Sequence, residues 1–389
     1  MSTKYLALSL LIASCLFLSA QEPASITQIG QFNAPNLEYQ SYFGAAAVIA
    51  GDTIVISAPN NELVGGQIFI YEKPSGGWAS TITPAATIGS SCNEGGRLAI
   101  SADGSTIAAT DAQCYGGLGF GATAVDVFVR PASGWQSTAT PTAVVVNKNG
   151  GTSGSECGNN FGLSSDGKTL VCSDSFGFTR KNYLFFFDRP SSGWANTTTP
   201  NLSVSVNAYA RQIALNGNTV VTESNFESTL NVLQRTASGL KQLATLTTSD
   251  GASVGYGLAT DAQTIAVQGF PAGTTPTKVY IFSKPASGWT NATETAQLSG
   301  GGSPGVGWGL AKNGNTLLAG SQGAAYVFFK PASGWTRTSQ PNATILSTDP
   351  YQLNFGAAVA MQGQTIVIGD PFEGQNYNEN GAAYIFQTQ

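Results

Sequence analysis

The chain has 389 residues, of which 10% are charged, and a formal net charge of −5, whereas typical soluble domains carry roughly 25% charged residues. This charge-poor, acidic composition argues against nucleic acid or an anionic membrane as a partner. Histidine is absent, which excludes Ser-His-Asp and Cys-His catalysis and histidine-ligated metal sites. The 42% hydrophobic content argues against disorder and favours a secreted all-β protein.

The first twenty residues have the pattern of a signal peptide. Lys4 supplies the positive charge, residues 5–18 form an apolar stretch, and Ala20 ends a small-residue cleavage motif. The apolar stretch is too short for a comfortable membrane span. We therefore expect residues 1–20 to be removed and residues 21–389 to be secreted as one extracellular domain, without membrane insertion. The alternative is a lipoprotein anchored through Cys15.

One strand-like tract recurs seven times along the chain. Its first and last copies, "FGAAAVIAGDTIVISAP" (43–59) and "FGAAVAMQGQTIVIGDP" (355–371), match at most positions. Each copy has a short turn, commonly containing Gly, Asp or Asn, followed by a β-branched run, which indicates a hairpin. The aligned threonines are Thr53, Thr106, Thr169, Thr219, Thr264, Thr316 and Thr365. A period of about fifty residues is typical of a four-stranded blade, so the sequence predicts an all-β, seven-bladed β-propeller.

A six-residue motif, which we call the word, lies between the third and fourth strands of most copies. It reads "KPSGGW" (73–78), "RPASGW" (130–135), "RPSSGW" (189–194) and "KPASGW" (284–289 and 330–335), with a worn copy, "RTASGL", at 235–240. Proline cannot donate a hydrogen bond to the sheet and so ends the third strand, and Ser-Gly makes the turn. A tryptophan repeated in step with the fold is expected to pack against its blade rather than bind a ligand.

The seventh copy ends at residues 382–389, without the word and without a fourth strand. The segment "ASITQIG" (24–30), near the mature N-terminus, resembles the fourth strands "PAATIGS" (84–90) and "NATILST" (342–348). We therefore predict that an N-terminal strand completes the last blade, which closes the ring and leaves no open blade edge.

The "FG…TIVISAP…GGQIFIY" pattern resembles the FG-GAP repeat of integrin α-subunit propellers and their bacterial relatives. The resemblance extends over residues 24–389 and implies a seven-bladed propeller with an adhesion or binding role. Members of the family often carry a calcium loop between the first two strands. Here those turns hold at most one acid each, at Asp52, Asp103, Asp166 and Asp261. Calcium needs six to eight oxygen ligands, so we expect neither a metal nor another cofactor.

Four cysteines remain after the signal segment, and an even number in an exported chain indicates disulfides. We predict the within-blade pairs Cys92–Cys114 and Cys157–Cys172, with Cys92–Cys157 across neighbouring blades as the alternative.

Four N-x-S/T sequons begin at Asn196, Asn201, Asn291 and Asn342. They are exposed glycosylation acceptors on the outer rim or chance matches in a chain rich in Ser, Thr and Asn.

The variable connections of the repeat join strands two and three within a blade (2–3) and strand four to strand one of the next blade (4–1), and both lie on one face. Function is commonly carried by variable loops on a rigid scaffold. Asp111, Asp174 and Asp370 occupy one aligned position there. In one interpretation, carboxylates and aromatics of this face bind a ligand; in the other, the aspartates cap loops and the aromatics fill them. The candidate ligand-binding residues are Asp111, Asp174, Asp370, Tyr115, Phe178, Phe270 and Tyr377.

From these features we expect a secreted, monomeric, non-catalytic binding or adhesion module for a surface glycan or protein, and not an enzyme. The first alternative is a carbohydrate-active enzyme that uses paired carboxylates, with Asp111, Asp174, Glu223 or Asp370 as candidates. The second alternative is a structural scaffold without a small ligand.

Overall fold

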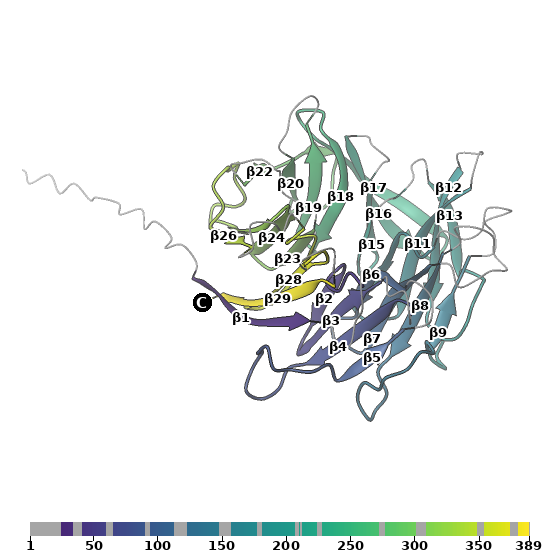
Figure 1. Ribbon diagram of the computed structural model, residues 1–389. Coiled ribbons are helices and arrows are strands. Elements are labelled where there is room, and N and C mark those ends of the chain that lie inside the picture. The colour runs from purple at the N-terminus through teal and green to yellow at the C-terminus, as the bar shows by residue number, and fades with distance from the viewer. Residues whose placement is uncertain are drawn as a thin grey trace, which may run out of the picture.

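The computed structural model describes residues 25–33, 41–59, 65–89, 94–112, 123–147, 157–176, 181–206, 210, 212–223, 228–271, 277–300, 309–347, 354–373 and 380–388. Within these ranges the chain forms seven sheets and no helix. Figure 1 shows the sheets arranged around a common centre. The predicted all-β, seven-bladed propeller is confirmed.

Each of the first six blades is built around strands that follow one another along the chain, and the seventh combines both ends of the chain. Blade one contains β2 (Ala47–Ala50), β3 (Thr53–Ala58), β4 (Gln67–Glu72) and β5 (Ala86–Ile88). Blade two contains β6 (Glu94–Ile100), β7 (Thr106–Ala112), β8 (Thr123–Val129) and β9 (Ala143–Val145). Blade three contains β10 (Phe161–Leu163), β11 (Thr169–Phe176), β12 (Lys181–Asp188) and β13 (Leu202–Val206).

Blade four contains β14 (Ile213–Asn216), β15 (Thr219–Glu223), β16 (Thr229–Thr236) and β17 (Gly239–Thr247), to which β21 (Ala292–Thr293) adds in parallel. Blade five contains β18 (Ser253–Thr260), β19 (Thr264–Phe270), β20 (Lys278–Ser283) and β22 (Ala296–Leu298). Blade six contains β23 (Leu310–Asn313), β24 (Thr316–Ser321), β25 (Ala324–Phe329) and β26 (Ala343–Leu346). Blade seven contains β27 (Ala358–Gln362), β28 (Thr365–Asp370), β29 (Ala382–Thr388) and β1 (Ile26–Asn33).

The seven aligned threonines each begin the second strand of a blade, so the repeat sets the strand register. These second strands are largely buried on both sides, as in β3, where all six residues are buried. The buried side chains form clusters that bridge neighbouring blades, such as Val55 and Ile68 of blade one with Ile107 of blade two. Because both faces of every sheet are covered, the core is a ring of inter-blade layers.

The predicted closure is confirmed by the pairing of β1 with β29. The two strands are antiparallel, with Ile26 opposite Thr388 and Asn33 opposite Ala382, and Figure 1 shows β1 beside β29. Phe32 of β1 also stacks on Tyr71 of blade one, with 4.2 Å between ring centroids. The N-terminal strand therefore completes the last blade and contacts the first.

The six-letter word forms the same turn in five blades. Its glycine N–H donates to the carbonyl of its proline, for example Gly193 to Pro190 at 3.0 Å. The glycine has a positive φ of 90° to 103° in all five copies, a region that other residues rarely adopt. In blade four the word lacks proline and tryptophan, and the chain makes a direct hairpin in which Thr236 lies opposite Gly239.

The tryptophan of the word packs against the preceding blade. Trp78, Trp135, Trp194 and Trp335 are buried, and Trp289 is partly buried. Trp194 lies in the cluster between blades two and three and donates its indole N–H to the carbonyl of Gly167 at 3.0 Å. The prediction that these tryptophans pack is confirmed.

Two residues after the tryptophan, the chain reaches the outer strand of the preceding blade. In four blades the side-chain oxygen at this position accepts a backbone N–H from that strand at 2.8–3.0 Å. We call these contacts the rim clamps: Ser80 to Gln31, Ser137 to Thr87, Asn196 to Val144 and Asn291 to Thr245. Further along the word's loop, Asn201 and Asn342 accept the N–H groups of Asp188 and Phe329. All four sequon asparagines therefore have a structural hydrogen bond of their own.

Cys157 and Cys172 form a disulfide with Cα atoms 5.1 Å apart, as predicted. Cys92 and Cys114 lie outside the described residues, and so do residues 1–20, the expected signal peptide. The part of the chain that the structure describes has no helix of the length and hydropathy needed to span a membrane.

Candidate functional site

Blade two carries two buried aspartates on one side of its sheet. Asp111 is the penultimate residue of β7 and is 2% exposed, and Asp126 lies in β8 and is 1% exposed. Asp111 is opposite Ala124 in the register. Because side chains alternate along a strand, Asp126, two residues beyond Ala124, lies on the same side as Asp111.

This pair lies between blades one and two. Ala109 and Phe128, on the same side of the sheet as the aspartates, pack in a cluster with Ile68 of blade one. Glu94, which is fully buried, is opposite Asp111 at the start of β6. Glu94 and Asp111 therefore lie at strand ends that lead into the variable 4–1 and 2–3 connections, while Asp126 lies in the middle of β8.

The two aspartates have different pKa values for an identifiable reason. Burial raises the pKa of Asp111 to about 6. Burial, together with the negative charge of Asp111, raises the pKa of Asp126 to about 8. The Oδ1 atom of each has no hydrogen-bond partner among the described residues. Near neutral pH the pair can therefore hold one shared proton, which leaves one carboxyl group able to accept a proton and the other able to donate one.

The other predicted carboxylates are distributed one per blade. Asp370 ends β28 and Glu223 ends β15, and both are buried. Asp174 is opposite Tyr183 in blade three, and its side chain lies outside the described residues. The aligned aspartates, Asp111, Asp174 and Asp370, thus occupy equivalent places in three different blades and do not form a pair with one another.

The structure describes one of the predicted aromatic residues, and their ligand-binding role stays a prediction. Phe270 is 37% exposed at the end of β19. Phe372, in the loop after β28, is 42% exposed and contacts Tyr42, with ring centroids 5.0 Å apart. Tyr115, Phe178 and Tyr377 lie outside the described residues.

The acids of the 1–2 turns hold the backbone of those turns. Asp103 accepts hydrogen bonds from Ser101 and Ser105, which lower its pKa. Asp166 accepts from Ser164 and from the N–H of Lys168 in the same way. Among the described residues there is no group of three histidine, cysteine or acidic side chains that could hold a metal ion.

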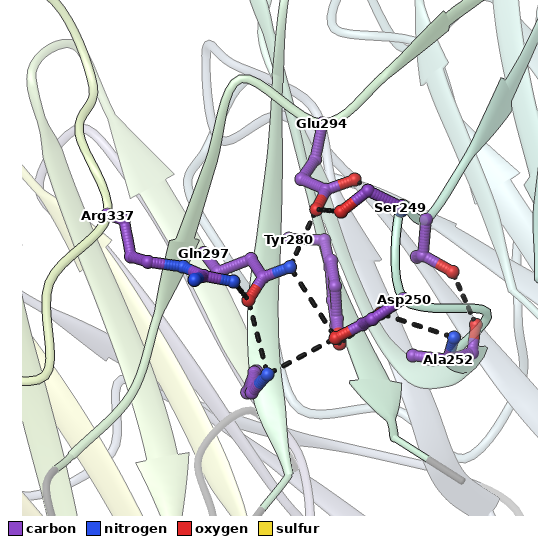
Figure 2. Close-up of polar contacts among 9 residues, drawn as sticks. Ser249, Asp250, Ala252, Tyr280, Glu294, Gln297 and Arg337 are labelled. Carbon is purple, nitrogen blue, oxygen red and sulfur yellow. Dashed lines mark hydrogen bonds and ion pairs between the residues drawn. The ribbon is translucent and has the colours of Figure 1, made fainter.

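A second polar site lies at the outer rim between blades five and six. Lys278, Gln297 and Arg337 line a cavity of about 470 Å³ there, together with Leu298, Ser299 and residues 338–340. Figure 2 shows Arg337 on one side of Gln297 and the carboxylates Asp250 and Glu294 on the other. Lys278 and Arg337 both donate to Oε1 of Gln297.

Glu94, Asp126, Lys278, Gln297 and Arg337 were not among the sequence predictions for these sites. Asp126 has a recognisable signal, since it is the single charged residue in the apolar strand "TAVDVFV". Arg337 also has one, because it stands where four other blades have serine or asparagine. Lys278 and Gln297 have no such signal in the sequence, because they are ordinary strand residues that reach the pocket only through tertiary packing.

Comparison with known proteins identifies one repeat and many similar folds. A family model described as the FG-GAP repeat matches residues 352–386, and no curated protein gives a significant match. A periplasmic gluconolactonase of Pseudomonas aeruginosa is 16% identical, with 79% of this chain and 89% of that chain covered and a TM-score of 0.53.

Two further solved structures reach the same TM-score. A putative 6-phosphogluconolactonase of Bacteroides fragilis is 13% identical, with 85% of this chain and 99% of that chain covered, at a TM-score of 0.53. Hydrazine synthase of Kuenenia stuttgartiensis is 14% identical, with 90% and 97% covered, at 0.53. At such low identity these likenesses show the fold alone.

The comparisons nevertheless correct the expectation of a non-catalytic binding or adhesion module. The similar propellers include those described as lactonases, so the shared fold does not favour the expected adhesion role over an enzymatic one. The expectation rested on the adhesion role of integrin-like propellers, and a shared repeat does not carry a shared role. The part of the resemblance that concerns structure is confirmed: the chain is a seven-bladed β-propeller, and its residues 352–386 match the FG-GAP repeat.

Proposed function

We propose that the chain is a hydrolase of sugar-acid lactones in which Asp111 and Asp126 form the acid–base pair. The observation that carries the proposal is this buried pair, whose pKa values of about 6 and about 8 lie on either side of neutrality. Such separation is the arrangement by which two carboxyl groups take opposite roles in proton transfer. The similar folds described as lactonases support the choice of substrate class.

In this mechanism the ionised Asp111 removes a proton from a water molecule, whose oxygen attacks the lactone carbonyl carbon. The bond between that carbon and the ring oxygen then breaks. Protonated Asp126 gives its proton to the departing ring oxygen, which becomes a hydroxyl group. The product is the open-chain hydroxy acid, and a proton passing from Asp111 to Asp126 restores the pair. No histidine is needed for these steps.

The first test is hydrolysis of glucono-1,5-lactone by residues 21–389, followed by pH-stat with the spontaneous rate subtracted. We expect Asp111→Asn and Asp126→Asn each to reduce kcat by about 10²- to 10⁴-fold, the usual contribution of general acid–base catalysis. Asp370→Asn is the matched control, because Asp370 is buried at the aligned position of blade seven and should leave the rate unchanged. A folded wild-type protein that does not exceed the spontaneous rate on any aldonolactone would refute the proposal.

The pH dependence provides a second readout. The plot of kcat against pH should be bell-shaped, with apparent pKa values near 6 and 8 that describe the two carboxyl groups together.

The raised pKa values also predict that the free energy of unfolding falls as pH rises from about 4 to about 8, since the folded state then holds more protons than the unfolded state. Asp126→Asn removes this loss, so it should raise Tm more at pH 9 than at pH 5. An equal change at both pH values would contradict the raised pKa.

We also infer that the enzyme acts outside the cytoplasm, after cleavage behind Ala20. The disulfide between Cys157 and Cys172 supports export, because such bonds persist in oxidising compartments. Mass spectrometry of the exported protein tests this directly: a mature N-terminus at Gln21 is expected, whereas a lipid-modified N-terminus at Cys15 would establish the lipoprotein alternative.

A further inference from the structure

The rim clamps recur in four blades and provide a reference with which the corresponding position of blade six can be compared. In blades one, two, three and five, the residue two positions after tryptophan is Ser or Asn, and its oxygen accepts a backbone N–H of the preceding blade. Backbone pairing at this point is maintained in blade six, where Thr338 bridges Leu298 and exchanges two hydrogen bonds with blade five. The side chain at the clamp position of blade six, however, is Arg337, which has no acceptor to offer.

Arg337 instead donates to Oε1 of Gln297. Gln297 is 4% exposed, and its amide separates two kinds of charge. Its oxygen faces Arg337 and Lys278, and its Nε2 donates to Glu294 at 2.7 Å and to Asp250 at 3.5 Å. Figure 2 shows this division, with Glu294 and Asp250 on the far side of Gln297 from Arg337.

The two carboxylates are already satisfied within the protein. Asp250 accepts from the Tyr280 hydroxyl, from Lys278 at 3.2 Å and from the N–H of Ala252. Neither Asp250 nor Glu294 lines the cavity, whereas Lys278 and Arg337 do.

Glu294 is satisfied as well, because it accepts from both the N–H and the hydroxyl of Ser249. Within the described residues, Arg337 has no carboxylate partner. Of the two cations that line the cavity, Lys278 is paired with Asp250, so the uncompensated positive charge and the unused donors are those of the Arg337 guanidinium.

The remaining lining is polar and small. Ser299, Ser339 and Gln340 supply hydroxyl and amide groups, and Leu298 is the apolar member. The volume of about 470 Å³ is that of a small-molecule site. We propose that this rim pocket binds an acidic sugar, whose anionic group is held by Arg337 and Lys278 and whose hydroxyl groups face the serines and Gln340. The site is separate from the proposed catalytic pair of blade two.

The test is isothermal titration of residues 21–389 with three probes: sodium glucuronate, glucose and inorganic phosphate. Glucuronate should bind, with an affinity that falls as salt is added. Glucose should bind about tenfold or more weakly, because it lacks the charge. Phosphate should also bind weakly, because it lacks the sugar hydroxyls. No binding of glucuronate would overturn the proposal, and equal binding of phosphate would overturn the sugar part of it.

Arg337→Ser is the informative variant, because it gives blade six the clamp residue of blade two and should fold normally. It should weaken glucuronate binding about 10- to 100-fold through loss of charged hydrogen bonds, and Lys278→Ala should act in the same direction. Lys330→Ala is the matched control, since Lys330 follows β25 at the opposite end of blade six. Unchanged binding in a folded Arg337→Ser would refute the site. Asp126→Asn should leave glucuronate binding intact, which distinguishes failure of this proposal from failure of the catalytic one.

Discussion

Blade two and blade six have the same rim backbone but different rim chemistry. In blade two, Ser137 accepts the N–H of Thr87 while Thr138 bridges Ile88. In blade six the corresponding bridge is intact, but Arg337 leaves the clamp position without an acceptor and lines a pocket. The difference shows that one side chain replaces a structural contact with the wall of a pocket while the backbone keeps the same path. In a repeat protein, the local departures from a structural rule are the places to look for function.

Removal of residues 25–33 is expected to have the largest effect on this rim. It takes away the outer strand of blade seven and the partner of the Ser80 clamp. A domain's total stability is about 5–15 kcal/mol, so we expect loss of the cooperative melting transition in calorimetry. Thr27→Ala with Gln28→Ala, at two exposed positions of β1, is the control and should melt like the wild type. A normal transition after the deletion would contradict the closure.

Next in size is Trp194→Ala, which removes an indole that is 6% exposed between blades two and three. Truncation of a buried tryptophan costs about 3–5 kcal/mol, measurable by denaturant unfolding. Leu240→Ala in blade four is the comparison, since this partly buried side chain stands where the worn word has lost its tryptophan. It should cost clearly less, and equal losses would show that the tryptophan has no special role.

A smaller effect is expected from Asn196→Ala, which leaves the N–H of Val144 without its side-chain acceptor. The loss of one such hydrogen bond costs about 1 kcal/mol. Asn196→Ser should retain most of the stability, because Ser137 and Ser80 perform the same role in other blades. If serine and alanine were equally destabilising, the clamp would not depend on an accepting oxygen.

The smallest predicted effect has the opposite sign. Arg337→Ser introduces an acceptor at the one clamp position occupied by arginine and should stabilise the protein by up to about 1 kcal/mol. Arg337→Ala, which cannot accept, is the control for loss of the arginine alone. Melting temperatures measured without added anions would separate the two, and destabilisation by serine would show that Arg337 itself supports the rim.

Much of the architecture followed from local patterns. The aligned threonines located the second strands, and the Pro-x-x-Gly turn located the end of the third, because proline and glycine restrict the backbone wherever they occur. The missing fourth strand of the last copy was sufficient to predict that β1 pairs with β29. The placement of Cys157 and Cys172 in one predicted blade likewise favoured their disulfide.

The candidate sites were predicted less completely. Asp111 and Asp370 were found as aligned acids, yet alignment places equivalent residues in different blades and cannot bring them together. The partner of Asp111 is Asp126, from the adjacent strand of the same blade. That Asp126 lies beside Asp111 becomes known only with the strand register, because the register shows which residues of two neighbouring strands face each other.

By itself the sequence determined the number of blades, the strand order and the turn at each tryptophan, because these depend on periodicity and on the backbone preferences of single residues. Only the tertiary structure decided which polar groups meet. Burial beside blade one raises the pKa of Asp111 and Asp126. Packing of blade five against blade six places Lys278, Gln297 and Arg337 around one cavity. Those contacts join residues of distant sequence, and their energies depend on distance and desolvation, which no local pattern encodes.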